Sequence, residues 1–408
     1  MATIKPFRAL RPVPEKAERV SSAPYDVVQT AEVRQTIQEN PLSFLRITRS
    51  EAEFADTASP DPSEVFARSR DNLQQFIERG IFFTENEPAL YVYRIKVDGH
   101  QQTGIVACCS LDEYENGLIK KHEKTRPDKV KDRTDHLLAV RAQTGLILLA
   151  FRGTDDIRRS LTEAVTHTPL YDFCCEGGVQ HTFWRIDETN NWVDAFREIP
   201  SLYIADGHHR VESAELARNE LRSANALHTG KEEYNYVLAG VFPSEELRIL
   251  PYNRSVSALN GLSDEDFLGR IAESFIVTET DRTTPERSGE ICMYLNKKWY
   301  LLRFAVNYIR QPEPVERLDV TILHNYILKP VLGIEDERTD ERLSFVGGAQ
   351  SISKLVKRVD EGRSRVAFSL YPTSMEDLLA VSDMNEIMPP KSTWFDPKLK
   401  DGILIHLI

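Results

Sequence analysis

The segment that most constrains this chain runs from an apolar stretch, Leu202–Ala205, through Asp206-Gly207-His208-His209-Arg210 into a stretch of helical periodicity that ends near Ala226. The apolar stretch is short and β-prone, and the Asp206-Gly207 pair interrupts it. Apolar residues then recur at the spacing of one helix face. The sequence therefore predicts a strand, a tight turn and a helix in direct succession.

The start of such a helix suits an anion, because it presents unpaired N–H groups and the positive end of the helix dipole. Gly207 lets the backbone approach a phosphate closely, and Arg210 offers a planar fork that matches phosphate oxygens. His208 and His209 add donors that titrate near neutral pH. Asp206 could hold Mg²⁺ or accept a proton. The alternative is a plain turn, with Asp206 as helix cap and both histidines in solvent.

Signals for strands and helices alternate along the rest of the chain, which predicts an α+β or mixed α/β fold. The expected strands are residues 90–97, 103–110, 146–151, 180–186, 236–242 and 366–371, the first two joined as a hairpin. The expected helices are residues 31–39 with Thr30 as N-cap, 64–79 with Ser63 as N-cap, 317–328 and 374–381, and residues 402–408 should join a sheet.

The length of 408 residues favours two domains, or one domain with a large extension. We place the boundary within residues 250–263, so that residues 1–250 form one domain, which contains the predicted anion-binding turn. Residues 251–408 would form a C-terminal α/β domain whose last segment returns toward the site.

The amino-acid composition restricts the kinds of binding partner and the cellular compartment that we expect for this chain. The chain has 63 acidic and 51 basic residues and a net charge of −12, which repels nucleic-acid backbones on average. The five cysteines lack the spacing of zinc sites and favour reduced thiols in a cytoplasmic protein. No apolar run is long enough to span a bilayer and no signal-peptide pattern is visible, so we expect no membrane partner. The oligomeric state stays open, a homodimer included.

Residues 120–133 reverse the local charge of this acidic chain. The segment holds seven basic residues: Lys120, Lys121, Lys124, Arg126, Lys129, Lys131 and Arg133. Such a patch could hold a polyphosphate or a carboxylate, although a solvated charged loop would look the same. Arg126 stands where a zinc-protease motif would need its second histidine after His122-Glu123.

A carboxylate near the hydroxyl of an alcohol substrate can orient it and accept its proton. Asp26 and Glu123 are the first candidates, ahead of Asp206. An aspartate after a proline-tyrosine pair is also typical of an ordinary turn. The Pro389-Pro390 pair fixes the backbone before Lys391 and would aim its ammonium at a phosphate, unless the prolines only end the preceding segment.

Four segments, in order along almost the whole chain, carry a resemblance to a known family. They are Ser22-Ala23-Pro24-Tyr25-Asp26-Val27-Val28, Lys121-His122-Glu123-Lys124-Thr125, Asp206-Gly207-His208-His209-Arg210 and Met388-Pro389-Pro390-Lys391-Ser392-Thr393. They resemble a family of bacterial proteins of similar length, a domain of unknown function that looks related to free serine kinases of the ParB/sulfiredoxin superfamily. The central segment is similar to the loop that holds nucleotide phosphates there, with His208 where sulfiredoxins carry their nucleophilic cysteine.

The resemblance implies a ParB/sulfiredoxin-like nucleotide-binding core with large additional α/β elaborations, and it makes residues 1–250 the nucleotide-binding and catalytic domain. It implies that ATP or ADP, with Mg²⁺, donates a phosphoryl group to free L-serine. The implied roles are catalysis for Asp26, Glu123 and Asp206, phosphate binding for Gly207, His208, His209, Arg210 and Lys391, substrate binding for His122, Thr125 and Arg126, and Mg²⁺ binding for Asp206.

Two other functions stay open: a ParB-like nucleotide-binding regulatory module without kinase activity, and a structural protein that inherited the fold. The sequence contains no GxxxxGK[ST] loop, no protein-kinase motif set and no GxGxxG, so other nucleotide-binding classes are disfavoured. On the motif alone, Arg210→Ala should weaken nucleotide binding and leave stability nearly unchanged.

Overall fold

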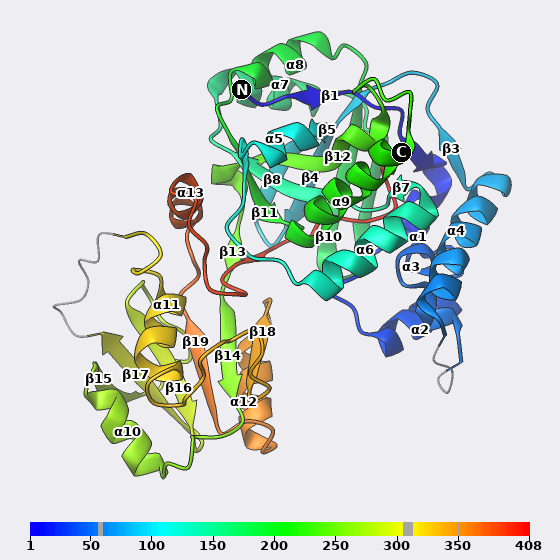
Figure 1. Ribbon diagram of the computed structural model, residues 1–408. Coiled ribbons are helices and arrows are strands. Elements are labelled where there is room, and N and C mark those ends of the chain that lie inside the picture. The colour runs from blue at the N-terminus through cyan, green and yellow to red at the C-terminus, as the bar shows by residue number, and fades with distance from the viewer. Residues whose placement is uncertain (56–59, 305–312, 350) are drawn as a thin grey trace. The chain divides into compact units, whose positions relative to one another are not determined.

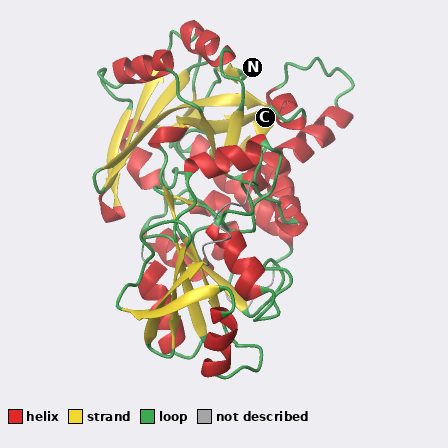
Figure 2. Cartoon of the chain, turned by 90° about the vertical axis from the view of Figure 1, so that its left-hand side faces the viewer, coloured by secondary structure: helices red, strands yellow, loops and turns green. Residues whose placement is uncertain are grey.

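The computed structural model describes residues 1–55, 60–304, 313–349 and 351–408, and it divides the chain into two compact units (Figure 1). Unit 1 comprises Met1–Lys120, Thr125–Leu247 and Pro397–Ile408. Unit 2 comprises Lys121–Lys124 and Arg248–Asp396. Strands form sheets in each unit and helices flank them (Figure 2), so the fold is of the mixed α/β class that the sequence predicts.

Unit 1 is built on a nine-stranded sheet of mixed direction. In spatial order its strands are β6 (Ile119–Lys120), β11 (Leu202–Asp206), β8 (Ile147–Phe151), β12 (Tyr236–Pro243), β5 (His100–Ser110), β4 (Leu90–Val97), β10 (Val179–Ile186) and β9 (Tyr171–Cys175), and β1 (Ile4–Lys5) pairs with β5. β8 runs parallel to β12 and β6 runs parallel to β11. Every residue of β8 is buried, as expected for an interior strand that is covered on both faces.

Helices cover this sheet and position the start of α9. The helices of unit 1 are α1 (Ala17–Val20), α2 (Thr30–Glu39), α3 (Leu45–Thr48), α4 (Pro62–Glu78), α5 (Leu111–Glu115), α6 (Pro127–Val140), α7 (Asp155–Ala164), α8 (Asn190–Arg197) and α9 (His208–Ala224). Leu149 of β8 and Val241 of β12 share one core cluster with residues of α5, α7, α8 and α9. α6 and α9 lie side by side (Figure 1), and the Ser213 hydroxyl of α9 donates to the Val130 carbonyl of α6 at 3.0 Å.

The two ends of the chain meet within unit 1. Leu10 and Ile405 exchange two backbone hydrogen bonds of 3.0 Å, and Ser22 and Asp401 exchange two of 3.1 Å. Two small sheets lie here: β2 (Leu10–Pro12) with β3 (Phe82–Thr84), and β21 (His406–Leu407) with β7 (Ala142–Gln143). The prediction that the last residues join a sheet is therefore confirmed.

Unit 2 contains a six-stranded antiparallel sheet. Its order is β15 (Phe275–Thr280), β17 (Lys298–Phe304), β16 (Glu290–Leu295), β19 (Val366–Leu370), β14 (Tyr252–Val256) and β18 (Leu343–Gly347), and β13 (Ile249–Leu250) pairs separately with β20 (Trp394–Phe395). The helices are α10 (Asp264–Ala272), α11 (Asp319–Leu323), α12 (Ser351–Asp360) and α13 (Met375–Asp383). The helix expected over residues 317–328 is α11, which continues as a π-helical turn over His324–Leu328.

The predicted N-caps of two helices are wrong by one or two residues. Thr30 is the first residue of α2, and the extended residue before it, Gln29, is the N-cap. α4 begins at Pro62, and the Asp61 side chain accepts from the Ser63 N–H at 2.8 Å. Proline suits the first helical position because its φ is already helical and its missing N–H would have had no partner there.

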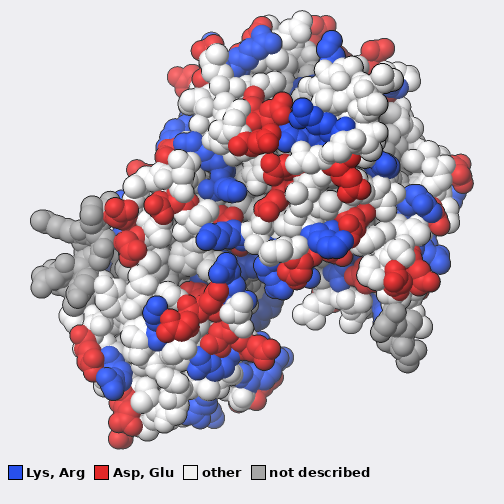
Figure 3. All heavy atoms as spheres, in the orientation of Figure 1, with Lys and Arg blue, Asp and Glu red and all other residues white. Residues whose placement is uncertain are grey.

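The surface and the thiols agree with an ordinary globular protein. Acidic and basic side chains are intermixed on the face shown in Figure 3, without a broad field of one sign over the described residues. Among those residues, no helix combines the length and apolar composition needed to cross a bilayer. The cysteines are free thiols, and Cys108, Cys109 and Cys292 are buried.

Candidate functional site

The start of α9 has the backbone geometry that the motif predicts. β11 ends at Asp206, Gly207 adopts φ 96° and ψ 29°, and α9 begins at His208. A side chain at Gly207 would be strained at this φ, and its Cβ would lie 3.1 Å from Cγ2 of Ile147. The positive end of the α9 dipole lies at this turn, and Gly207 has no side chain that could cap the first N–H groups of the helix.

Arg210, in the first turn of α9, lies in a buried ion pair. Its Nη1 donates to Oδ1 of Asp401 at 3.2 Å and to the Leu146 carbonyl at 2.9 Å, and its Nη2 donates to Oδ2 of Asp401 at 3.3 Å. The Arg210 and Asp401 side chains are 16% and 2% exposed. Gly145 makes room for the pair, since a Cβ there would lie 2.4 Å from Nη1 of Arg210 and from Oδ1 of Asp401. Arg210 therefore ties α9 to the C-terminal segment.

Further charges crowd the same guanidinium. Oδ1 of Asp26 lies 4.0 Å from Nη2 of Arg210, and the Asp26 side chain is 53% exposed. Burial alone would lower the pKa of Arg210, but the charges of Asp401 and Asp26 outweigh burial and raise it. Burial raises the pKa of Asp401 to about 6 although Arg210 opposes the shift. A further cation would thus stabilise the ionised form of Asp401.

The loop that carries Asp26 is fixed by Arg49. Nη1 of Arg49 donates to the carbonyls of Tyr25 at 2.8 Å and Val28 at 2.6 Å, and its Nη2 donates to Oγ1 of Thr30 at 2.9 Å. The backbone on both sides of Asp26 is therefore anchored while its carboxylate stays half-exposed beside Arg210. Such a carboxylate can accept a proton or bind a hard cation.

Both oxygens of the Asp206 carboxylate are engaged within unit 1. Oδ1 accepts from the Gly207 N–H at 2.8 Å, and Oδ2 accepts from Nζ of Lys398 at 2.6 Å. Asp206 can therefore bind Mg²⁺ only if the Lys398 ammonium moves away. On this observation Asp26 fits the oxygen-donor chemistry of Mg²⁺ better than Asp206 does.

Thr125 and Arg126 lie against the first turns of α9. Oγ1 of Thr125 donates to Oε2 of Glu212 at 2.5 Å, and the Arg126 N–H donates to Nε2 of His209 at 3.0 Å. A nitrogen that accepts carries no proton, so the neutral ring of His209 carries its proton on Nδ1. The Arg126 guanidinium pairs with Asp128 at 2.9 Å and is exposed.

The other three predicted residues, His122, Glu123 and Lys391, belong to unit 2, where His122 contacts the loop 388–393 that carries Lys391. The Met388 N–H donates to the His122 carbonyl at 2.8 Å, and Oγ1 of Thr393 lies 3.5 Å from Nε2 of His122. Lys391 adopts φ 55°, and its Nζ lies 5.6 Å from the ring centroid of Tyr252.

Arg254, which the sequence did not single out, holds that loop. Its Nη2 donates to the Pro390 carbonyl at 2.9 Å and its Nη1 donates to the Lys391 carbonyl at 3.1 Å. Its Nε and Nη2 each lie 3.3 Å from Oε2 of Glu337, and the two side chains are 0% and 2% exposed. Burial lowers the pKa of Arg254, and the charges of Glu337 and Glu123 oppose this.

Unit 1 thus brings together Asp26, Thr125, Arg126 and the residues from Asp206 to Arg210, of which His208 is buried. Unit 2 brings together His122, Glu123 and Lys391. Sequence reasoning missed the partners of these residues: Lys398, Asp401 and Arg254. Charged residues directly before the apolar last segment were an available signal for Lys398 and Asp401, because a charge carried into a core needs a partner.

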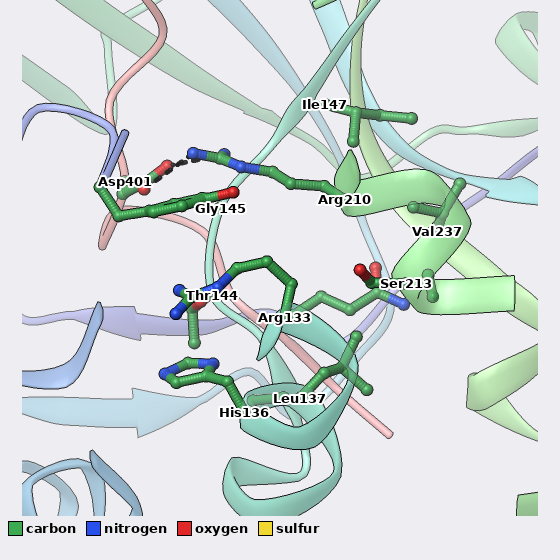
Figure 4. Close-up of a pocket in the computed structure, with 14 residues that line it drawn as sticks. Arg133, His136, Leu137, Thr144, Gly145, Ile147, Arg210, Ser213, Val237 and Asp401 are labelled. Atoms are coloured by element: carbon green, nitrogen blue, oxygen red, sulfur yellow. Dashed lines mark hydrogen bonds and ion pairs between the residues drawn. The ribbon is translucent and has the colours of Figure 1, made fainter. Parts of the chain in front are cut away.

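A cavity of about 50 Å³ lies beside the Arg210–Asp401 pair, entirely within unit 1 (Figure 4). Its wall comes from α6, the segment 142–147, the first turns of α9 and the C-terminal segment. The polar lining residues are Tyr25, Arg133, His136, Gln143, Thr144, Arg210, Ser213 and Asp401.

Comparison with known proteins places the chain in a family. Among solved structures, a conserved hypothetical protein from Pyrococcus furiosus is 15% identical, with 74% of this chain and 95% of that chain covered and a TM-score of 0.38. A free serine kinase variant in complex with AMP is 12% identical, with 76% and 93% covered and a TM-score of 0.38. SbnI with a C-terminal truncation, from Staphylococcus aureus, is 12% identical, with 73% and 86% covered and a TM-score of 0.39.

No curated protein matches the sequence. The model of the family described as Protein of unknown function (DUF1015) matches residues 4–321, which is well over half of the chain. This chain therefore belongs to the DUF1015 family.

Proposed function

We propose that this protein is a phosphotransferase that moves a phosphoryl group from ATP or ADP to the hydroxyl of free L-serine. The observation that carries the proposal is the start of α9, a 17-residue helix whose dipole points into a turn made by a left-handed glycine. Helix starts of this kind bind phosphate through backbone N–H groups. The resemblance of the Asp206–Arg210 segment to nucleotide-phosphate loops supports the same ligand.

In the proposed reaction the nucleotide phosphates bind the backbone N–H groups of His208 and His209, and Gly207, whose own N–H binds Asp206, lets them approach the backbone closely. The serine hydroxyl attacks the terminal phosphorus, its proton passes to a carboxylate, and ADP or AMP leaves with the electron pair of the broken P–O bond. Asp26 is the first candidate for that carboxylate because it is anchored, half-exposed and beside Arg210. Mg²⁺, held by phosphate and carboxylate oxygens, would offset the charge between the phosphates.

The remaining residues keep their proposed roles. Thr125 and Arg126 are proposed substrate ligands at the first turns of α9 in unit 1, and His122 is a proposed substrate ligand in unit 2. Glu123 is the second candidate for the base, and Lys391 is a further phosphate ligand. The variants Glu123→Gln and Lys391→Met test these two roles separately.

The test is to incubate the full-length protein with Mg²⁺, ATP or ADP and each of a panel of free amino acids and small alcohols, and to follow phosphorylated product by mass. We expect O-phospho-L-serine in the serine sample. Asp26→Asn should remove transfer and retain nucleotide binding, whereas Asp156→Asn on the exposed face of α7 should change neither. Nucleotide binding without any phosphorylated acceptor would favour the regulatory module instead.

A further inference from the structure

We propose that the cavity beside the Arg210–Asp401 pair binds a small α-amino acid, with the carboxylate toward Arg133 and Thr144 and the ammonium toward Asp401. The inference rests on the proposed function in one respect, that this amino acid is the phosphoryl acceptor. Binding itself does not depend on that activity and can be measured without a nucleotide.

The size of the cavity suits a small molecule. A volume of about 50 Å³ is the room of roughly four water molecules, at about 10–15 Å³ for each. A purine ring or a triphosphate is larger than this. Figure 4 shows Arg210 and Asp401 at one end of the cavity and Arg133 and His136 at the other, with Thr144 and Gly145 between them.

Hydrogen-bond donors line one part of the wall. Arg133 donates to Asp132 through Nε at 2.8 Å and Nη2 at 2.6 Å, and its Nη1 has no acceptor among the residues that the structure describes. The Thr144 hydroxyl likewise has no partner within the described ranges. In Figure 4 the Arg133 guanidinium reaches toward Thr144. A guanidinium edge next to a hydroxyl is the arrangement that binds a carboxylate.

Tyr25 adds a neutral donor to the same lining. Burial raises the pKa of its phenol above the ordinary value, so the hydroxyl stays protonated at neutral pH. The Tyr25 ring centroid lies 4.4 Å from Cζ of Arg133 and 5.1 Å from Cζ of Arg210. These cation–π contacts hold both guanidinium groups at the cavity.

Acceptors line the remaining wall. Burial lowers the pKa of His136 to about 4, so its ring is neutral at pH 7. Nε2 of His136 lies 3.0 Å from the Ile47 carbonyl, which can only accept, so Nε2 carries the proton and Nδ1 is an acceptor. Asp401 supplies a carboxylate. Asp401 lies at the end of the cavity away from Arg133 (Figure 4), so its carboxylate suits the ammonium group of a ligand whose carboxylate faces Arg133.

Two other polar residues of the wall are occupied by protein partners and do not select the ligand. The Ser213 hydroxyl donates to the Val130 carbonyl, and the Gln143 amide binds the Tyr236 carbonyl and the Leu238 N–H. The groups that select the ligand are therefore Arg133, Thr144 and Asp401, which together suit a molecule that carries both a carboxylate and an ammonium group.

The first experiment is calorimetric titration of the full-length protein, without nucleotide, with L-serine, with lactate, which lacks the ammonium, and with ethanolamine, which lacks the carboxylate. We expect L-serine to bind and each single-charge analogue to bind at least about tenfold more weakly, because each analogue loses one of the two charged contacts with the wall. Equal binding of all three, or no binding of L-serine, would overturn the proposal.

Two variants locate the site. Thr144→Val and Arg133→Met should each weaken L-serine binding about tenfold while nucleotide binding stays within about twofold. Thr162→Val and Arg159→Met, matched substitutions on the exposed face of α7, should leave both unchanged. Serine binding that survives both Thr144→Val and Arg133→Met would place the amino acid elsewhere and overturn the inference.

The inference and the proposed function can fail separately. If serine is phosphorylated and Thr144→Val leaves the KM for serine unchanged, the phosphotransferase proposal stands and the cavity assignment falls. If L-serine binds in the cavity and no nucleotide supports transfer, the cavity assignment stands and the phosphotransferase proposal falls.

Discussion

Each unit of this protein contains a buried arginine that pairs with a buried carboxylate, and the two arginines differ in what else surrounds them. Arg254 of unit 2 is 0% exposed and donates to Glu337 and to the carbonyls of Tyr252, Pro390 and Lys391. Arg210 of unit 1 donates to Asp401 and to one carbonyl, and an exposed carboxylate lies 4.0 Å away.

The pKa values show the consequence of this difference. Burial lowers the pKa of Arg254, since Glu337 offsets its desolvation incompletely. The pKa of Arg210 is raised because two carboxylates, Asp401 and Asp26, outweigh burial. Arg254 is thus enclosed by protein groups and fixes a loop, whereas Arg210 stands in an excess of negative charge at the edge of a cavity, where a ligand can change its surroundings.

The largest expected effect on stability comes from breaking the enclosed Arg254–Glu337 pair of unit 2. Arg254→Ala leaves Glu337 buried without its guanidinium and frees the loop at Pro390 and Lys391, so we expect a loss of about 3–5 kcal/mol in the free energy of unfolding. Denaturant unfolding of the full-length protein measures this. The matched variant Arg365→Ala, which breaks an exposed pair with Asp264 in the same unit, should have a several-fold smaller effect. Similar losses from both variants would contradict an enclosed structural role for Arg254.

Breaking the Arg210–Asp401 pair of unit 1 should lower the free energy of unfolding by a smaller amount. Arg210→Ala removes the partner of Asp401, and we expect a loss of about 3 kcal/mol at neutral pH. This corrects the expectation from the motif alone, which treated Arg210 as an exposed ligand. The loss should shrink at pH 5, because Asp401 can then take up a proton and no buried charge remains. Unfolding curves at pH 5 and pH 8 test this, and an equal loss at both values would mean that Asp401 is not the group left uncompensated.

Local features of both regions were predictable from the sequence, because the information lies within a few residues. The apolar strand, the glycine turn and the amphipathic helix around Gly207 are contiguous. The β4–β5 hairpin is signalled by Asp98-Gly99, which adopt φ values of 47° and 75°. The helix starts at residues 29–30 and 61–63 were less predictable because serine, threonine, aspartate and proline compete for the same few positions.

The partners of the two arginines were not predictable, because they are distant in the sequence. Asp401 is 191 residues from Arg210, and Lys391 is 137 residues from Arg254. No local rule links such positions, and each arginine has many carboxylates available along the chain. The local motif identified Arg210 as an anion ligand, and the tertiary structure supplies it with a protein carboxylate.

The pH dependence of stability sharpens the assignment of Asp401. Its pKa rises from 3.8 in the unfolded chain to about 6 in the folded one, so the folded state binds more protons between these values. The contribution of this group to stability therefore falls as pH rises from about 4 to 6, by on the order of 2 kcal/mol. Asp401→Asn should remove this part of the slope. Thermal unfolding of both proteins across pH 4–8 provides the comparison, and parallel curves would refute the assignment.

The smallest expected effect on stability, and the most informative about the ligand, concerns Lys398. Its pair with Asp206 is partly exposed, with side chains 21% and 41% accessible, so Lys398→Met should change the free energy of unfolding by less than about 1 kcal/mol. The substitution releases Oδ2 of Asp206 beside the start of α9. If Asp206 is a Mg²⁺ ligand, the variant should bind Mg²⁺ with nucleotide more tightly, since the ammonium no longer competes. If Asp26 alone supplies the carboxylate, Mg²⁺ binding should stay unchanged in Lys398→Met and weaken in Asp26→Asn. Titration of Mg²⁺ into each nucleotide-saturated variant decides between the two carboxylates. If Asp26 is the ligand, the half-exposed carboxylate next to Arg210 is the group that makes the surroundings of Arg210 differ from those of the enclosed Arg254.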